Sequence, residues 1–410
     1  MRILIASDVY PPEPRGGARH FQLLAKHLNQ RGHKVAVCTT AFPGYARYTE
    51  EDGLPVYRMH GLFSRIPFLY QVHAGRFPPP LTDWILSRGL RKVIERHKPD
   101  VVHTQGWIIQ SVISALGEYN IPLVMSLLDY RAICPAAGMV PYAGVCGMSL
   151  GLPCVACSRT LYGAGPLGTA KSLAAYIKTR GNKSKFHRVN RLIAISTYMK
   201  KMHVEHLGMD ASRFTVIPPF HDYETGGGME VSDLLPEDFM LFVGALTPAK
   251  GVDVLIEAYR RLSTETRLVM IGIEYPNYKY SFQDSRIILI RNPARDVVLD
   301  AYRKCRFVVF PSVWPEPAGR VAFEAMAYRK AVVASGTGGI TDIVVDNETG
   351  ILVPPGDSDA LAQAMKHLLD NPQHAVKMGQ LGYDRWMRLF TPDAVIPQIE
   401  KVHQSILTER

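Results

Sequence analysis

Short apolar runs alternate along the whole chain with segments in which apolar residues recur at helical spacing. The runs cover residues 2–7, 34–40, 100–105, 122–127, 191–196 and 214–219 in the first half, and 239–245, 267–272, 286–290, 306–310 and 330–335 in the second. Strands that alternate with helices in this way are typical of α/β folds, in which helices cover both faces of a parallel sheet. The pattern therefore predicts one such sheet in each half.

A break between the two halves predicts a domain boundary. The segment that begins at residue 221 contains three consecutive glycines and several acidic residues, a composition typical of a linker. A chain of 410 residues is also longer than one hydrophobic core usually holds. We expect two doubly wound, Rossmann-like domains at 1–220 and 221–390, with a terminal helix at 391–410 that packs back on the first domain. The ligand site is expected at the carboxyl ends of the strands, in a central cleft that both domains face.

Positive charge is concentrated in one segment of the first domain. The chain has a formal net charge of +10, but residues 130–204 hold 11 Lys and Arg and no Asp or Glu. Two interpretations remain open. The segment is a solvated basic face, or it meets an anionic partner such as a phospholipid surface, a lipid-linked phosphate or a nucleic acid.

The sequence contains no run that predicts a membrane-spanning helix. No apolar stretch approaches the roughly 20 residues that such a helix needs. The N-terminal run is too short for a secretory signal and reads as a first strand. We therefore expect a cytoplasmic protein, peripheral on the inner face of the membrane if the basic segment binds lipid.

Two glycine-containing turns follow predicted strands and precede predicted helices. Gly16 and Gly17 follow the first strand, and Gly244 and Lys250 follow the strand at 239–245. Backbone N–H groups at a helix start attract anions, and a lysine beside them can meet a phosphate. An ordinary tight turn and a solvated lysine explain each feature equally well when it is taken alone.

Two glutamates, Glu316 and Glu324, flank the start of an apolar helical segment. A helix that is apolar on nearly all sides is buried, so Glu324 needs a partner. That partner is Arg320, four residues earlier, or a ligand with vicinal hydroxyls such as a ribose. Glu316 lies before the helix start, where Gly319 exposes backbone donors to an anion. Carboxylates on both sides of an anion-binding helix start can accept hydrogen bonds from sugar hydroxyls beside a diphosphate bound there. This arrangement predicts a nucleotide-sugar site.

The same segment carries a family resemblance. The stretch from Pro311, "PSVWPEPAGRVAFEAMAYRKAVVASGTGGITDIVVDNETGILVPPGD", closely resembles the E-x7-E region of glycosyltransferase family 4. The stretches "VGALTPAKGVDVLIEAY" and "PPEPRGGARHFQLLAKHLNQRGHKVAV" are similar to the same family. The resemblance covers almost the whole chain and implies a GT-B fold and a hexosyltransferase that takes its sugar from a nucleotide diphosphate. It also implies retention of anomeric configuration and no metal requirement. Because no residue is placed as a covalent nucleophile, we expect front-face substitution.

The resemblance assigns roles residue by residue. Glu316 would contact the transferred sugar and Lys250 the diphosphate, which makes them the expected catalytic residues. The donor-binding residues that it implies are Gly16, Gly17, Gly244, Asn292, Gly319, Arg320, Val321 and Glu324. The donor is expected to be a UDP-, GDP- or ADP-sugar, and the acceptor a glycan that is lipid-linked or phosphorylated. No nucleic-acid partner is expected.

The chain departs from the family pattern mainly on the acceptor side. The expected acceptor-side residues are His103, Gln105, Asp129 and Tyr130. Gln105 stands where a histidine often follows "VVHT", and Leu128 stands where relatives commonly have a histidine near the reacting sugar. Ala245 also replaces an arginine that contacts phosphate in many relatives. These departures leave an alternative open, a nucleotide-sugar-binding subunit or pseudoenzyme without transferase activity.

Four of the six cysteines are clustered in a glycine- and proline-rich segment that is expected to be an irregular loop. Cys134, Cys146, Cys154 and Cys157 supply enough thiolates for a tetrahedral structural zinc site. Free thiols and a disulfide are the other interpretations, and a disulfide is the least favoured in a cytoplasmic protein. A structural zinc is thus the one metal that the sequence suggests, and no cofactor is expected in catalysis.

Overall fold

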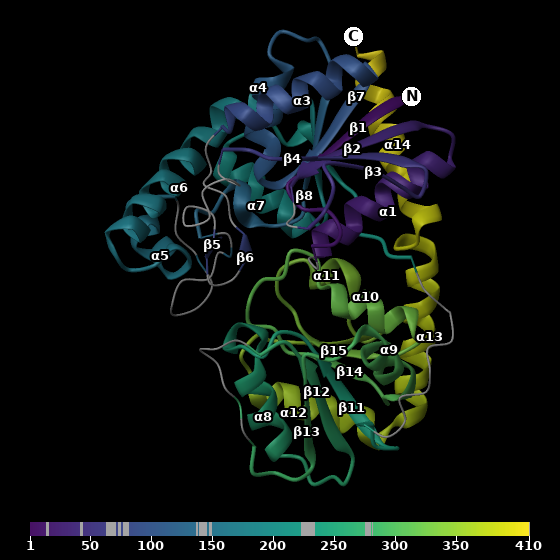
Figure 1. The fold of residues 1–410 in the computed structure, drawn as a ribbon. Helices are drawn as coiled ribbons and strands as arrows, with labels where there is room; N and C mark the ends of the chain where they lie inside the picture. Colours follow the sequence, from purple (N-terminus) through teal and green to yellow (C-terminus); the bar gives the residue numbers. More distant parts are fainter. Residues whose placement is uncertain are drawn as a thin grey trace. The chain divides into compact units, whose positions relative to one another are not determined.

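The computed structural model describes residues 1–13, 16–41, 44–62, 71–72, 75–76, 82–136, 138, 146, 150–222, 234–274, 280 and 282–409. The chain divides into two compact units. The first unit comprises residues 1–221 and 392–410, and the second comprises residues 222–391. Each unit contains its own largely parallel sheet with helices packed on it (Figure 1).

The sheet of the first unit has eight strands in the order β10-β9-β8-β7-β1-β2-β4-β3. Their bounds are β1 Arg2–Ser7, β2 Lys34–Thr40, β3 Tyr48–Glu51, β4 Leu54–Met59, β7 Val101–Gln105, β8 Leu123–Leu127, β9 Arg191–Ala194 and β10 Phe214–Val216. A short hairpin of β5 (Gln71–Val72) and β6 (Gly75–Arg76) stands apart from this sheet. β1 lies between β2 and β7, so that Ile5 pairs with Val37 on one side and His103 on the other. The chain reverses its strand order at this point, where open α/β sheets usually bind ligands.

Seven helices belong to the described part of the first unit. They are α1 Gly16–Gln30, α3 Trp84–His97, α4 Ile109–Leu116, α5 Pro153–Tyr162, α6 Pro166–Lys185, α7 Thr197–Leu207 and α14 Pro392–Thr408. The last helix packs its apolar residues, among them Val395, Ile399 and Ile406, into the same core as β1 and α1. Its Glu400 accepts a hydrogen bond from Arg31 Nε at 2.9 Å and lies 2.8 Å from His33 Nε2. The C-terminal helix is therefore an integral part of the first unit.

The sheet of the second unit has six strands, all parallel, in the order β13-β12-β11-β14-β15-β16. Their bounds are β11 Phe239–Val243, β12 Arg267–Gly272, β13 Ile287–Arg291, β14 Val308–Phe310, β15 Val332–Ser335 and β16 Gly350–Val353. The helices are α8 Val252–Arg260, α9 Arg295–Lys304, α10 Arg320–Ala327, α11 Ile340–Ile343, α12 Ser358–Asp370 and α13 Pro372–Leu389. β11 is the switch point here, because β12 lies on one side of it and β14 on the other.

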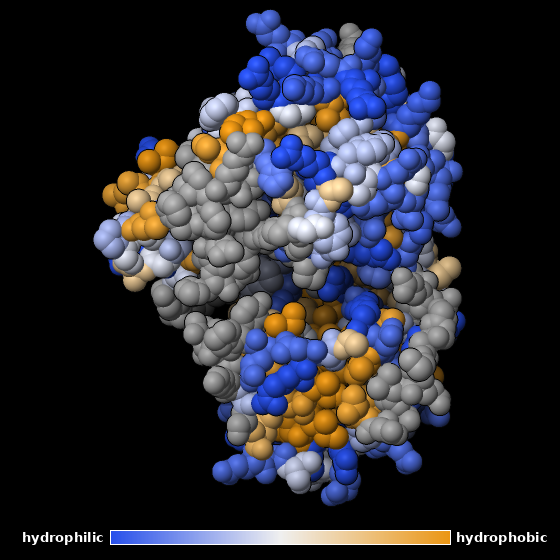
Figure 2. Space-filling view, in the orientation of Figure 1, coloured by the Kyte–Doolittle hydropathy of each residue, from blue (hydrophilic) through white to orange (hydrophobic). Residues whose placement is uncertain are grey.

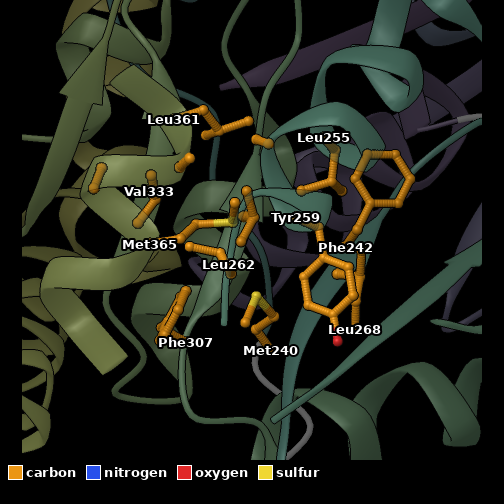
Figure 3. Packing of buried hydrophobic residues seen from close by; sticks show 14 of the residues in the cluster. Met240, Phe242, Leu255, Tyr259, Leu262, Leu268, Phe307, Val333, Leu361 and Met365 are labelled. Carbon is orange, nitrogen blue, oxygen red and sulfur yellow. The ribbon is translucent and has the colours of Figure 1, made fainter. Parts of the chain in front are cut away.

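A large apolar cluster holds the second unit together. Figure 3 shows Phe242 from β11, Tyr259 from α8 and Met365 from α12 gathered over one face of the sheet. Tyr259 is fully buried, and its hydroxyl donates to the carbonyl oxygen of Thr266 at 2.8 Å. Because the buried polar group has a partner, its burial carries no unpaired-donor cost. The cluster fixes α8 and α12 on the sheet and so fixes the turn that precedes α8.

Every strand that the apolar runs predict is present, and three elements of the two sheets were not predicted. β3 and β4 form an antiparallel pair at one edge of the first sheet, and β16 is an edge strand of the second sheet. The sequence of β3, "YTEE", is largely polar because this edge strand is only partly buried. The segment around Cys154 and Cys157 was expected to be irregular, but both residues lie on α5, so that expectation was wrong. No helix in the described residues is long and apolar enough to cross a membrane.

Candidate functional site

Neighbouring strands bring the Lys250 turn and the Glu316 loop together in the second unit. β11 and β14 are parallel, so their carboxyl ends lie at the same edge of the sheet. Lys250 ends a short 3-10 turn after β11, and Glu316 follows β14 in the loop before α10. Gly251 has a φ of +72°, and a Cβ there would lie 1.8 Å from the carbonyl oxygen of Pro311. Glycine is therefore required where the two segments touch.

Lys250 and Glu316 form an ion pair at this point. Glu316 is buried, and its Oε1 also accepts a hydrogen bond from Ser312 Oγ at 3.1 Å. The Lys250 ammonium lies 4.7 Å from the centre of the Trp314 ring. Both contacts of Glu316 use Oε1, and no described residue donates to Oε2. The site therefore presents a fixed ammonium beside a carboxylate that can accept further hydrogen bonds.

The Glu316 loop is held from its other side by the turn after β15. Gly339 N–H donates to the carbonyl oxygen of Glu316 at 2.7 Å. Gly338 has a φ of +66°, and a Cβ there would lie 2.5 Å from the Glu316 nitrogen. Glycine at this position thus has a definite role, since it allows two backbones to approach closely.

Glu324 lies in a different network, inside α10. It is buried, Arg295 Nη2 donates to its Oε1 at 3.0 Å, and Tyr302 Oη donates to its Oε2 at 3.1 Å. Arg320, the partner that the spacing suggested, is farther away, with Nε 3.6 Å from Oε1. Burial lowers the pKa of Arg295, but the Glu324 carboxylate outweighs burial and holds that pKa above its usual value. Burial and the same carboxylate raise the pKa of Tyr302 well above its usual value, so the phenol stays a hydrogen-bond donor.

The start of α10 lies between the two glutamates in the sequence. Gly319 is its N-cap, with a φ of 75°, and a Cβ there would lie 2.7 Å from Ile340 Cδ1. The following Arg320 is exposed and Val321 is half-buried. Backbone N–H groups in the first turn of a helix have no partner within the helix, so this turn can donate to an anion.

The remaining predicted donor residues lie at neighbouring strand ends. Gly244 follows β11, and a Cβ on Gly272 would lie 1.8 Å from its carbonyl oxygen. Asn292 follows β13, is exposed and has a φ of +48°, and its N–H donates to the carbonyl oxygen of Gly272 at 2.9 Å. Both residues therefore belong to the carboxyl edge of this sheet, but neither contacts the Lys250–Glu316 pair in the described contacts.

In the first unit, three residues singled out in the sequence meet at one point. Gly17 lies in the first turn of α1, and a Cβ there would lie 3.3 Å from Gln105 Oε1 and 3.6 Å from Leu128 Cδ1. Gly16 begins the same helix. Gln105 is buried, and its Nε2 donates to Ser7 Oγ at 2.7 Å. The two departures from the family pattern thus lie together beside the glycine-containing turn.

A pocket opens next to these residues at the carboxyl edge of the first sheet. Its lining includes Gln105, Leu128 and Asp129, together with Lys178 from α6 and Trp107. The Lys178 ammonium lies 4.1 Å from the centre of the Trp107 ring. Burial, with the nearby charge of Arg131, lowers the pKa of Lys178 to about 7. A group that binds or releases a proton near neutral pH is therefore present in this pocket.

Arg131 organises the acidic side of the pocket. Its Nε donates to Asp129 Oδ2 and its Nη1 to Asp8 Oδ2, both at 2.7 Å. Burial lowers the pKa of Arg131, but the two carboxylates outweigh burial and raise it. Gly106 makes room for this arrangement, because its φ is +70° and a Cβ there would lie 2.2 Å from Asp8 Oδ1.

Two predicted acceptor-side residues lie in the core instead of the pocket. His103 is fully buried, with Nε2 2.8 Å from Ser126 Oγ and Nδ1 3.1 Å from His403 Nε2 of α14. Burial and the charge of His403 lower the pKa of His103 well below its usual value. Tyr130 is fully buried as well. The structure thus buries both side chains, and the C-terminal helix contacts His103 through His403. Their place on the acceptor side stays a prediction.

Within the described part of the chain, the clustered cysteines do not form a recognisable metal site. Cys146 and Cys154 lie close enough to Cys157 to raise its pKa, an effect to which burial contributes most. All six cysteines are free thiols. No group of three or more His, Cys, Asp or Glu that could hold a metal ion occurs among the described residues. The structural zinc stays a prediction, which metal analysis of the purified protein would check.

Several site residues were not singled out in the sequence. Arg295 and Tyr302 reach Glu324 from α9, a contact across 29 and 22 positions that no local spacing reveals. Lys178 belongs to the basic segment 130–204, which was expected to face solvent or an anionic partner, but its side chain is buried and lines the pocket. Its helical spacing from Ala175 and Asn182, which are also buried, was the signal that could have placed it there.

Comparisons with known families cover most of the chain. The family described as "Glycosyl transferase 4-like domain" matches residues 15–219, which is half of the chain. The family described as "Glycosyl transferases group 1" matches residues 232–385. These two matches fall on the first and second units respectively.

Individual proteins give the same result. The chain is 32% identical over 172 residues to an uncharacterized glycosyltransferase of Methanocaldococcus jannaschii, a match that spans 41% of this chain and about half, 48%, of that protein. It is 26% identical over 408 residues to the glycogen synthase of Mycobacterium tuberculosis, covering 94% of this chain and 90% of that protein.

Solved structures show the same fold. Sucrose-phosphate synthase from Thermosynechococcus elongatus superimposes with a TM-score of 0.73 at 18% identity, over 100% of both chains. HepE from Anabaena, solved in complex with UDP-glucose, superimposes with a TM-score of 0.68 at 18% identity, over 99% of this chain and 100% of that one. The chain therefore belongs to the glycosyltransferases with a glycosyl transferase 4-like domain, and it has the GT-B fold.

Proposed function

We propose that this glycosyltransferase moves a sugar from a nucleotide-diphosphate donor to a glycan acceptor with retention of anomeric configuration. The observation that carries the proposal is the Lys250–Glu316 ion pair at the carboxyl edge of the second sheet. The fixed ammonium of Lys250 can bind the diphosphate of a nucleotide sugar. The Glu316 carboxylate, which can accept further hydrogen bonds, can bind the hydroxyls of the sugar.

The donor would bind through three sets of groups in the second unit. Lys250 and the backbone donors at the start of α10 would meet the diphosphate, where a helix N-terminus adds favourable charge. Glu316 would accept hydrogen bonds from hydroxyls of the transferred sugar. Glu324, held by Arg295 and Tyr302, would accept hydrogen bonds from the ribose, because each carboxylate oxygen can accept more than one bond.

The transfer step is a front-face substitution. The bond between the anomeric carbon and the diphosphate oxygen breaks while the acceptor oxygen forms its bond to the same face of that carbon. The acceptor proton goes to the departing diphosphate oxygen, so the step needs no separate base. Negative charge develops on the diphosphate in the transition state, and a preorganised ammonium such as that of Lys250 stabilises it. This role of Lys250 is the reason for proposing that transfer needs no metal ion.

The acceptor would enter the pocket of the first unit. Lys178 suits an anionic group on that acceptor, because its ammonium faces the pocket and pairs with no carboxylate among the described residues. We therefore propose a phosphorylated or lipid-linked acceptor. The reaction would occur in the cytoplasm, at the inner face of the membrane.

Related proteins support a nucleotide-sugar donor. HepE was solved with UDP-glucose, and a starch synthase from Arabidopsis was solved with ADP and acarbose. These complexes share the fold, and their ligands support a nucleotide diphosphate as part of the donor. They leave UDP, GDP and ADP as alternatives for the base.

A two-stage experiment tests the proposed function. A thermal-shift screen with UDP, GDP and ADP identifies the base, and Lys250→Met should lose the shift that the preferred nucleotide gives to the native protein. The matching nucleotide sugars are then supplied with cell lipid extract, and release of the nucleotide is measured with and without EDTA. Release that depends on the extract and resists EDTA is expected. Donor binding without release on any acceptor pool would instead favour a nucleotide-sugar-binding subunit.

A further inference from the structure

Helix α6 buries its polar side and exposes its apolar side. Its buried residues are Gly168, Ser172, Ala175, Tyr176, Lys178, Thr179 and Asn182. Its two leucines and its isoleucine are exposed, with accessible fractions of 48% for Leu167, 46% for Leu173 and 60% for Ile177. A surface helix of a water-soluble protein normally shows the opposite arrangement. The exposed side is therefore suited to an apolar environment.

The three exposed side chains form one stripe. Successive helical residues are about 100° apart, so Leu167, Leu173 and Ile177 fall within about 120° of arc. Ala170 lies within the same arc and is exposed. We call Leu167, Leu173 and Ile177 the α6 stripe. Figure 2 shows hydrophobic side chains gathered over α5 and α6, on the left of the view.

The neighbouring helix extends the apolar surface. α5 packs against α6, and Leu152, immediately before α5, is 73% accessible. Exposed apolar side chains gathered on two neighbouring helices usually mark a contact with a protein or a membrane.

The charge around the stripe identifies the partner. Lys171 and Arg180 border it on its two sides, and Lys185 lies at its C-terminal end. Residues 130–204 contain no acidic residue at all. An apolar face flanked by lysine and arginine is the pattern of helices that lie in the interface of an anionic membrane. No described helix, α6 included, could span the bilayer.

A second copy of this chain is a poorer partner for the same surface. A symmetric dimer would place the α6 stripe against its own copy. The bordering lysines and arginines would then face each other without a carboxylate from this segment, and like charges across an interface are unfavourable.

We propose that the α6 stripe inserts into the interfacial region of an anionic phospholipid membrane while the basic residues beside it contact lipid headgroups. The proposal rests on the proposed function and deepens it, because an enzyme bound to the membrane and a lipid-linked acceptor would both diffuse in the plane of the same bilayer. Vesicle binding is measured without donor or acceptor, so it can fail while sugar transfer stands, and the reverse also holds.

The test compares vesicle binding of the native protein with that of a stripe variant. Purified native protein is sedimented with vesicles of phosphatidylcholine alone and of phosphatidylcholine mixed with phosphatidylglycerol. Binding to the mixed vesicles is expected, with weaker binding at high salt. The triple variant Leu167→Ser, Leu173→Ser, Ile177→Ser should lower the partition coefficient by about tenfold or more. The control replaces two exposed apolar residues of the second unit, Val376→Ser and Met387→Ser, and should bind as the native protein does.

Folding and self-association are checked on the same samples. Near-UV circular dichroism and the thermal unfolding midpoint of the triple variant should match those of the native protein, because the replaced side chains are exposed. The proposal is overturned if native protein ignores mixed vesicles or if the triple variant binds them equally well. It is also overturned if sedimentation velocity shows a native dimer that the triple variant converts to a monomer, since the stripe would then contact a second copy.

Discussion

Lys250 forms an ion pair with Glu316, a residue 66 positions farther along the chain. The pair exists because β11 and β14 are neighbours in the sheet, and each residue follows the end of its strand. The Lys250 ammonium has three hydrogen-bond donors, and in the described contacts one of them is donated to Glu316. The arrangement leaves donors for a diphosphate while the carboxylate keeps the lysine in place.

Removing the Lys250 charge should slow transfer strongly without unfolding the protein. In Lys250→Met no ammonium stabilises the negative charge that develops on the diphosphate. We therefore expect the rate of nucleotide release in the presence of acceptor to fall by about 100-fold or more. Lys366→Met is the matched control, because Lys366 is exposed and pairs only locally with Asp370 in the described contacts. Equal rates for the two variants would remove Lys250 from the mechanism.

Glu324 should act in nucleotide binding and not in the chemical step. Glu324→Gln loses the charged contact with Arg295, and we expect the Kd for the nucleotide to rise by about tenfold. Tyr302→Phe removes the hydrogen bond from the phenol but keeps the ion pair with Arg295, so its Kd should rise less. Isothermal titration with the nucleotide measures both. A larger effect in Tyr302→Phe than in Glu324→Gln would show that the carboxylate does not contact the ligand.

Lys178 should act on the acceptor side alone. Lys178→Met keeps an unbranched apolar side chain but removes the ammonium that lies over the Trp107 ring, and we expect the KM for the lipid-extract acceptor to rise by about tenfold or more. Nucleotide binding should not change. Lys366→Met, at an exposed position on α12 of the second unit, serves as control. If Lys178→Met shows native kinetics, the pocket does not receive the charged part of the acceptor.

Buried histidines should make the protein sensitive to mild acid. Burial, the main cause, lowers the pKa of His203 to about 4 and that of His403 to about 3. The unfolded chain takes up these protons at about pH 6.5, whereas the folded chain resists them, so stability is present above pH 6.5 and lost as pH falls toward 4. Each histidine should contribute up to about 1.4 kcal/mol of unfolding free energy per pH unit in that window.

Urea unfolding at several pH values checks this expectation. His203→Gln should flatten the dependence of the unfolding free energy on pH between 6.5 and 4.5, because one proton uptake is removed. His187→Gln, an exposed substitution, should leave the slope unchanged. If the unfolding free energy of the native protein changes little with pH in this window, the account of the buried histidines is contradicted.

The sequence predicted the fold and the local positions of Glu316 and Glu324 because both follow from local patterns. Each apolar run formed a strand, and the E-x7-E segment placed Glu316 before α10 and Glu324 within it. The contacts of these residues could not be predicted, since Arg295 and Lys250 reach them through strand order. Strand order depends on the packing of the whole unit and not on any single segment.

The acceptor side was harder to predict because burial there depends on distant elements. His103 follows a strand pattern that suits a site, but α14, 300 positions away, covers it through His403. Lys178 lies in a basic segment and was expected on the surface, but the pocket side of α6 takes it inside. Charge composition showed how many basic residues the segment has and could not show which way each one points.

The most direct test of the central claim measures both the turnover and the nucleotide affinity of Glu316→Gln. With the nucleotide sugar that the native protein turns over, the variant should release nucleotide about 100-fold more slowly or not at all, because the transferred sugar loses its carboxylate and Lys250 loses its partner. Its affinity for the bare nucleotide should stay nearly native, and Glu257→Gln, an exposed position on α8, should behave as native in both assays. Native turnover by Glu316→Gln, or loss of nucleotide binding together with turnover, would contradict the assignment of Glu316 to the transferred sugar.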